Sequence, residues 1–268
     1  MIKAILTGHS RGLGAAIATA LLARGIGVLA IARSPNRELA EVAPPHLVQI
    51  ALDLSDPVAL AAWLTSPVLS GFINGTETAL LINNAGLLQP IGPLGTLDPA
   101  ALIQANNVNI GAPLLLANAF VAATRCCADR RILHVSSGAA RSPYAGWGSY
   151  CAAKAALDHH ARATALENIP GLRIASLAPG VIDTAMQAEI RASSIGQFPQ
   201  KERFEDLKAS GQLSTPSAAA EILVNYLLGR KFGEIVDGDL RHLPGSTPGP
   251  TGEASGSNRH QGGARTPP

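Results

Sequence analysis

Short, continuously apolar runs alternate along most of the chain with longer stretches in which apolar residues recur at helical spacing. Continuous runs, rather than alternating ones, are typical of strands that helices cover on both faces. The predicted strands are Ile2–Leu6, Gly27–Ala32, Leu47–Leu52, Ala79–Asn83, Arg131–Ser136, Leu172–Ala178 and Glu234–Val236. The predicted helices lie near residues 12–24, 56–66, 98–105, 108–124, 148–168 and 216–229. This order predicts an α/β fold, with a doubly wound parallel sheet in three α/β/α layers and right-handed crossovers.

The end of the chain has a different composition. Residues 1–242 show no internal repeat and no shift in composition, which predicts a single domain. From Leu243 to Pro268 the residues are almost all Gly, Pro, Ser, Thr or charged. Such a segment buries too little apolar surface to offset its ordering entropy, so we expect residues 243–268 to form a disordered tail.

Overall composition argues against several classes of protein. The 268 residues are 47% hydrophobic and 15% charged, a composition that is atypical of disordered chains. The formal net charge of +2 is low for a protein that binds nucleic acid or anionic membranes. The apolar stretch Leu13–Ala32 has Arg24 in its middle, which favours helix, turn and strand over a membrane span. Three cysteines without metal-ligand spacing indicate a reduced, cytoplasmic protein and no metal site.

A glycine-rich turn, TGHSRGLG at residues 7–14, follows the first predicted strand and leads directly into the first predicted helix. Gly8, Gly12 and Gly14 allow a tight turn and let a pyrophosphate approach the amides at a helix N-terminus. A plain structural turn is the alternative interpretation. The position between strand and helix favours dinucleotide binding.

The end of the second predicted strand bears on the choice of dinucleotide. Sites that prefer NAD usually place a carboxylate there, whereas this strand continues into Arg33. Arg33, together with Arg11 of the glycine-rich turn, suits a ribose 2′-phosphate. Both arginines are also compatible with ordinary solvent-facing loop positions. The pattern favours NADP(H).

The end of the third predicted strand offers a site for the adenine. Asp53 is placed to accept a hydrogen bond from the adenine amino group, with Leu54 packed nearby. The alternative is a loop carboxylate or a helix N-cap, a role that Ser55 and Asp56 can also fill.

Residues with acid–base chemistry gather further along the chain. Tyr150 and Lys154 are four residues apart in a helical pattern, so they share one helix face. A nearby ammonium stabilises a phenolate and lowers its pKa, as a general acid/base requires. Ser137, just beyond a predicted strand, can hold a carbonyl oxygen beside Tyr150. A Tyr–Lys pair alone is common by chance, and its joint spacing with Ser137 and the glycine-rich turn makes it specific.

Four motifs in this order resemble the short-chain dehydrogenase/reductase family, which implies a Rossmann-type sheet over about residues 2–240. They are TGHSRGLG (7–14), NNAG (83–86), Ser137 with YCAAK (150–154), and PGVIDT (179–184). The stretches around YCAAK and after PGVIDT further resemble the sepiapterin reductase/benzil reductase branch of NADPH-dependent carbonyl reductases.

The resemblance implies a role for each catalytic candidate. Tyr150 would donate the proton to the carbonyl oxygen, and Lys154 would bind the nicotinamide ribose hydroxyls and tune Tyr150. Ser137 would orient the substrate carbonyl, with Ser136 the less suitable neighbour. Asn109 would hold a water that links Lys154 to solvent.

The resemblance also implies how the cofactor is held. Asn84 would lie against the adenosine ribose, and Thr184 with the backbone of Ile182 would hold the carboxamide. The remaining contacts would come from the glycine-rich turn, through Gly8, Ser10, Arg11, Gly12, Leu13 and Gly14. Family analogy further suggests a homodimer or homotetramer formed through the helices near 108–124 and 148–168.

Substrate recognition is less determined by the sequence. Tyr144 and Trp147, between Ser137 and Tyr150, and Met186, after PGVIDT, are the candidates for the pocket wall. Ordinary packing within a helical cap is the alternative for these residues and for Ile190, Phe198 and Phe204. A carboxylate near the C-terminus, as sepiapterin reductases use for pterin, has two candidates, Asp237 and Asp239, and neither is in clear register.

The leading hypothesis is an NADPH-dependent carbonyl reductase that acts on a small, apolar ketone or vicinal diketone. No partner beyond a small-molecule carbonyl substrate and further copies of the chain is expected. One alternative is an NAD(P)-dependent alcohol dehydrogenase of the same fold. Another is a non-catalytic protein that senses NADP(H), although such proteins typically lose the Tyr or the Lys that this chain retains.

Overall fold

The computed structural model describes residues 1–42 and 45–243 and contains a parallel sheet of seven strands in the order β3-β2-β1-β4-β5-β6-β7. The strands are β1 (Ile2–Thr7), β2 (Gly27–Ala32), β3 (Leu47–Ala51), β4 (Thr78–Asn83), β5 (Asp129–Val135), β6 (Leu172–Ala178) and β7 (Asp237–Asp239). The predicted doubly wound parallel sheet is confirmed, because the strand order runs outward in both directions from β1 and β4.

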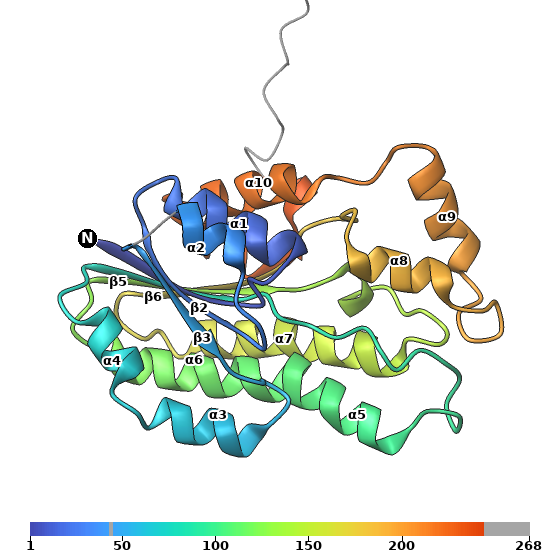
Figure 1. Ribbon diagram of the computed structural model, residues 1–268, viewed down its shortest axis with the longest axis horizontal. Coiled ribbons are helices and arrows are strands. Elements are labelled where there is room, and N and C mark those ends of the chain that lie inside the picture. The colour runs from blue at the N-terminus through green and yellow to red at the C-terminus, as the bar shows by residue number, and fades with distance from the viewer. Residues whose placement is uncertain (43–44, 244–268) are drawn as a thin grey trace, which may run out of the picture.

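Helices cover both faces of this sheet (Figure 1). One layer holds α1 (Gly12–Leu22), α2 (Arg37–Val42) and α10 (Pro216–Leu228). The other holds α3 (Pro57–Leu64), α4 (Val68–Ile73), α5 (Pro99–Asn106), α6 (Ala112–Ala123) and α7 (Gly148–Leu166). Two further helices, α8 (Ala185–Ala192) and α9 (Lys201–Ala209), lie beyond one end of the sheet (Figure 1).

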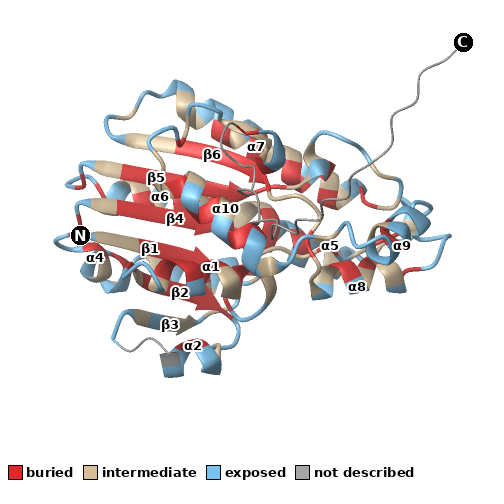
Figure 2. Cartoon of the chain, turned by 90° about the horizontal axis from the view of Figure 1, so that it is seen from above, coloured by how far each residue is buried: buried red, intermediate tan, exposed pale blue. Residues whose placement is uncertain are grey.

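Successive residues of a strand point into opposite layers, which explains why the strand sequences are apolar throughout. In β1, Ala4 and Leu6 join the core under α1 and α10, whereas Ile5 joins the core under α6. Figure 2 shows this burial concentrated along the strands between the two layers. The strands therefore form a rigid sheet, and the ends of the strands are fixed positions on which a site can be built.

The last strand differs from its prediction. Glu234–Val236, predicted as a strand, forms a turn, and β7 is instead Asp237–Asp239, paired with Ser176–Ala178 of β6. The apolar Val236 packs against the core from the turn, so the signal of burial was real and the inferred conformation was wrong. At this sheet edge the backbone pairing with β6 sets the strand, without buried apolar side chains.

Four helices were not predicted, namely α2, α4, α8 and α9. The first two have six residues each, which is too short for a clear helical period. The predicted helices 98–105 and 108–124 are α5 and α6, joined without a break by a π-helical turn, Asn107–Gly111.

Leu243, the first residue of the predicted tail, is buried in the core cluster that contains residues of α10. The rest of the predicted tail, residues 244–268, lies outside the described residues.

Candidate active site

The residues singled out from the sequence come from the carboxyl ends of successive strands, β1 to β6, or from the helices that follow. Such ends meet at one edge of a parallel sheet, where ligands of doubly wound folds bind. In chain order the segments are the turn 7–14 after β1, Arg33 after β2, Asp53 and Leu54 after β3, Asn84 after β4, Ser137 after β5, and Ile182 and Thr184 after β6.

The glycine-rich turn is closely packed. A Cβ atom on Gly14 would lie 2.0 Å from the Gly8 carbonyl oxygen, and one on Gly8 would lie 2.9 Å from Ala85 Cα. The Asn84 Nδ2 atom donates to the carbonyl oxygens of Thr7 at 2.9 Å and Gly8 at 3.2 Å. Asn84 therefore fixes the turn itself, in addition to the expected place near a ribose.

The start of α1 is suited to an anion. Arg11 occupies the N-cap in an extended conformation, and its side chain does not cap the helix. The first turn contains no acidic residue, so no carboxylate competes with an anion for the free amides and the positive end of the helix dipole. Thr184 closes this space, with its Cγ2 atom 3.5 Å from the position of a Cβ on Gly12.

Two exposed cations flank this space. Within residues 1–42 and 45–243, the side chains of Arg11 and Arg33 form no ion pair or hydrogen bond. The charge of Arg33 reaches Asp53, whose pKa is held below its usual value chiefly by the hydrogen bond from the Ser55 amide. Asp53 Oδ1 accepts this bond at 2.9 Å, whereas Asp56 is the N-cap of α3.

The three catalytic candidates lie where β5 meets α7. Lys154 Nζ donates to the Val135 carbonyl oxygen at 2.8 Å and lies 5.6 Å from the centre of the Tyr150 ring. Burial raises the pKa of Tyr150 to about 12, and a hydrogen bond with Ser137 opposes this rise. The direction is opposite to the lowering expected from the sequence. Burial also lowers the pKa of Lys154 to about 8.

Asn109 lies in the π-helical turn, an element that occurs frequently at functional sites. Its side chain accepts from the Leu87 amide at 2.8 Å and donates to the Leu87 carbonyl oxygen at 2.7 Å. A Cβ on Gly86 would lie 3.4 Å from Asn109 Oδ1 and 3.6 Å from Lys154 Nζ. Asn109 and Lys154 therefore flank the same glycine of the NNAG motif.

An apolar cluster covers Tyr150. The Trp147 ring lies 5.7 Å from the Tyr150 ring and stacks on Phe198 at 4.4 Å with an interplanar angle of 9°. Tyr144 and Met186 pack at the margin of this cluster. Ile190, Phe198 and Phe204 of the segment after PGVIDT are buried in this cluster and are packing residues of the cap, whereas Met186 is only partly buried. Sequence reasoning missed the remaining members, Leu88, Ile91 and Ala139.

The two carboxylates considered for a pterin have structural partners: Asp237 pairs with Arg162 and Asp239 with Arg241. Elsewhere on α7, His160 contacts the buried His134, with 3.1 Å between Nδ1 and Nε2. Within the described part of the chain there is no group of three or more His, Cys, Asp or Glu residues that could hold a metal ion, and no helix long and apolar enough to cross a membrane.

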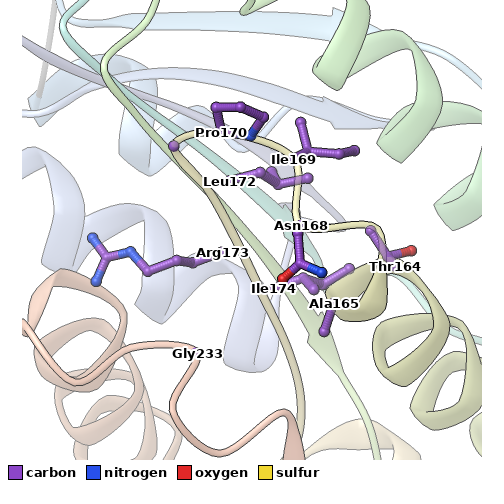
Figure 3. Close-up of a pocket in the computed structure, with 10 residues that line it drawn as sticks. Thr164, Ala165, Asn168, Ile169, Pro170, Leu172, Arg173, Ile174 and Gly233 are labelled. Carbon is purple, nitrogen blue, oxygen red and sulfur yellow. The ribbon is translucent and has the colours of Figure 1, made fainter.

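A cavity of about 370 Å³ lies at the other end of β6 (Figure 3). Asn168 and Pro170 from the loop after α7, together with Arg173 at the start of β6, contribute to its wall. It contains none of the candidate catalytic residues and is separate from the carboxyl edge.

Comparison with known proteins adds to this geometry. Residues 3–194 match the family described as short chain dehydrogenase. The chain is 35% identical over 241 residues to a benzil reductase ((S)-benzoin forming) of Bacillus cereus, covering 87% of this chain and 97% of that protein. It is 35% identical over 240 residues to the sepiapterin reductase of Meriones unguiculatus, covering 83% and 90%.

Two solved structures are similar over most of the chain. A short-chain dehydrogenase/reductase from Burkholderia vietnamiensis is 45% identical, with a TM-score of 0.66, covering 91% of this chain and 98% of that one. A metagenomic short-chain oxidoreductase in complex with NADP is 28% identical, with a TM-score of 0.65, covering 88% and 94%.

The packing at Gly14 yields a test of the turn. We expect Gly14→Ala to lower the free energy of unfolding by about 3 kcal/mol, because the added methyl group meets the Gly8 backbone. Gly25→Ala is the matched control, since Gly25 has a φ of +70° with open space around it. It should cost only about 1 kcal/mol, from its left-handed conformation alone. Urea unfolding measures both, and equal losses would contradict the close approach.

Proposed function

The chain belongs to the short-chain dehydrogenase family, and from this premise we propose that it is an NADPH-dependent carbonyl reductase that converts a ketone or vicinal diketone to an alcohol. The family makes it an oxidoreductase acting on C=O or CH–OH groups. The observation that carries the proposal is the placement of Ser137, Tyr150 and Lys154 together at the carboxyl edge, beside the glycine-rich turn.

The residues at this edge fit a dinucleotide. The turn leaves no room for side chains at Gly8 and Gly14, and the start of α1 has no acidic residue to repel a phosphate. Gly8, Gly12 and Gly14, with Ser10 and Leu13 of the same turn, would hold the pyrophosphate. Asp53, Leu54 and Asn84 would hold the adenosine, and Thr184 with the backbone of Ile182 would hold the carboxamide.

The charges at the rim support NADPH over NADH. Among the described residues neither Arg11, at the start of α1, nor Arg33, after β2, forms a hydrogen bond or ion pair with a carboxylate, although the charge of Arg33 acts on Asp53, and both side chains are exposed. Guanidinium groups bind phosphate in a bidentate, charge-assisted manner. A neighbour of the same fold is a complex with NADP.

When bound, the nicotinamide supplies a hydride for the carbonyl carbon. In the proposed reaction Tyr150 Oη donates a proton to the carbonyl oxygen, which the Ser137 hydroxyl orients by a hydrogen bond. Tyr150 Oη is protonated at neutral pH, as a proton donor must be, and the hydrogen bond with Ser137 acts against the rise in its pKa that burial causes. Lys154 Nζ, beside the Tyr150 ring, would return the proton, with Asn109 next to it at Gly86.

The cover over Tyr150 favours a flat, apolar substrate. Trp147 and Phe198 are buried behind Tyr150, at 4% and 0% exposure, so Tyr144 and Met186 at the margin of the cluster form its partly exposed wall. An aromatic ketone or diketone would gain an offset or edge-to-face contact with the Tyr144 ring. Relatives named benzil reductase agree with this substrate class.

We also propose that the protein is cytoplasmic and forms a homodimer or homotetramer through α6 and α7. Each helix carries an exposed leucine, Leu115 and Leu166, at 38% and 80% exposure. Burial of such residues against a second copy would be favourable.

The proton donor is tested by Tyr150→Phe. We expect turnover of a diketone to fall by about 10²- to 10⁴-fold, because the substitution removes the phenolic hydroxyl, which carries the proton, and keeps the ring. The dissociation constant of NADPH, followed by its fluorescence, should stay unchanged and serves as the control for folding. Turnover near the wild-type rate would refute the role of Tyr150. Binding of NADPH without turnover in the wild type would instead favour a sensor.

Cofactor preference is tested by Arg33→Ala. The variant should bind NADPH about 10- to 100-fold more weakly, through loss of one charge-assisted contact, and bind NADH as before. Arg37→Ala, which removes another exposed arginine of the same segment, is the matched control and should change neither affinity. Equal weakening of both cofactors by Arg33→Ala would contradict contact with the 2′-phosphate and favour the NAD(P)-dependent dehydrogenase.

A further inference from the structure

A buried carboxylate lies behind the catalytic candidates and takes no part in the reaction described above. Asp158 follows Lys154 by one turn of α7, and only 2% of its surface is exposed. Its Oδ1 atom accepts hydrogen bonds from the hydroxyls of Ser136 at 2.6 Å and Ser176 at 2.7 Å. Its Oδ2 atom accepts from Arg141 Nη1 at 2.5 Å. Such a fully partnered buried carboxylate needs several specific residues in place.

Two of these partners enclose the segment that carries Ser137. Ser136 directly precedes Ser137, and Arg141 directly follows the short 3₁₀ helix Gly138–Ala140 that Ser137 caps. Both ends of the segment are therefore tied to one carboxylate on α7. Arg141 also donates to the Gly238 carbonyl oxygen of β7 at 3.0 Å, which extends the connection to the edge of the sheet.

The same carboxylate is the negative charge that acts on Lys154. The other groups around Lys154 are the Val135 carbonyl oxygen, the Tyr150 ring and His134 of β5. Burial lowers the pKa of His134 to about 3, so this ring is neutral near pH 7. The charge of Asp158 acts against burial and raises the pKa of Lys154.

We propose that Asp158 is a positioning residue: it fixes the Ser137 segment against α7 through Ser136 and Arg141, and places its carboxylate one helical turn from Lys154. The same side chain thus holds the carbonyl-orienting hydroxyl in register with Tyr150 and keeps Lys154 cationic. This inference rests on the proposed function for its consequence in catalysis, and on the position of Asp158 one helical turn from Lys154 for its effect on Lys154.

The effect of the Asp158 charge on the titration of Lys154 can be measured without cofactor or substrate. The chain has five lysines, so ¹³C NMR of labelled lysine Cε resolves each titration, and Lys154→Ala identifies the signal of interest. In the wild type Lys154 should titrate near pH 8. In Asp158→Asn it should titrate about one pH unit lower. An unchanged titration in a folded Asp158→Asn variant would overturn the electrostatic part of the proposal.

Asp129→Asn is the matched control. Asp129, like Asp158, is a carboxylate paired with arginine. Its partners are Arg131 and Arg173, and it lies at the opposite end of β5. The variant should leave both the Lys154 titration and turnover unchanged. A shift of similar size in Asp129→Asn would mean that general loss of structure, rather than the charge of Asp158, moves Lys154.

Turnover tests the positioning. With NADPH and a diketone, kcat of Asp158→Asn should fall about 10- to 100-fold while KM for NADPH stays unchanged. In a plot of kcat against pH, the loss of activity on the alkaline side should occur at lower pH in Asp158→Asn than in the wild type, because Lys154 loses its proton at lower pH. Unchanged kcat and pH profile would refute the role in catalysis.

Ser136→Ala keeps the test decisive if Asp158→Asn does not fold. It removes the hydroxyl bond next to Ser137 and retains the charge, so kcat should fall while the Lys154 titration stays near pH 8. Ser176→Ala removes the second hydroxyl bond to the same oxygen and should keep kcat close to that of the wild type. Equal kcat in the two variants would overturn the positioning. A wild type that reduces no carbonyl would overturn the proposed function, while the NMR titration would still decide the effect on Lys154.

Discussion

The buried hydrogen bond from Lys154 Nζ to the Val135 carbonyl oxygen joins the central part of the sheet to helix α7. It fixes the height of the helix against the end of β5, and thereby the positions of Tyr150 on the helix and Ser137 beyond the strand. The bond also satisfies a buried ammonium that would otherwise be costly to keep away from water. The catalytic arrangement is thus a consequence of how α7 packs on β5.

Burial at this junction has opposite effects on its two titratable groups. The pKa of Tyr150 rises to about 12, so burial by itself makes Tyr150 a weaker acid, while that of Lys154 falls to about 8. A lysine that titrates near neutrality needs a nearby negative charge to stay cationic, and Asp158 supplies it. The cap over Tyr150, with Trp147 stacked on Phe198, maintains the burial on which both shifts depend.

Much of this was predictable from the sequence, for identifiable reasons. Strands β1, β2 and β4 to β6 were predicted because their buried residues are mostly apolar, whereas β3 was predicted from an apolar run although it is only partly buried. Ser137, Tyr150 and Lys154 were predicted because their spacing is local. Strand β7 was missed because an edge strand made of Asp, Gly and Asp carries no apolar signal. The role of Asp158 left no pattern, since its partners Ser136, Arg141 and Ser176 come from separate elements that only the fold brings together. The contacts of cofactor and substrate with individual residues stay predictions.

We propose that the edge of the sheet formed by these elements reduces a carbonyl group with NADPH. The most direct test is the initial rate of NADPH oxidation by the wild-type protein with benzil, run in parallel with NADH and with a simple aromatic ketone and sepiapterin as further substrates. We expect the wild-type protein to reduce the diketone, and to do so faster with NADPH than with NADH. Tight binding of NADPH with no turnover of any of these substrates would contradict it.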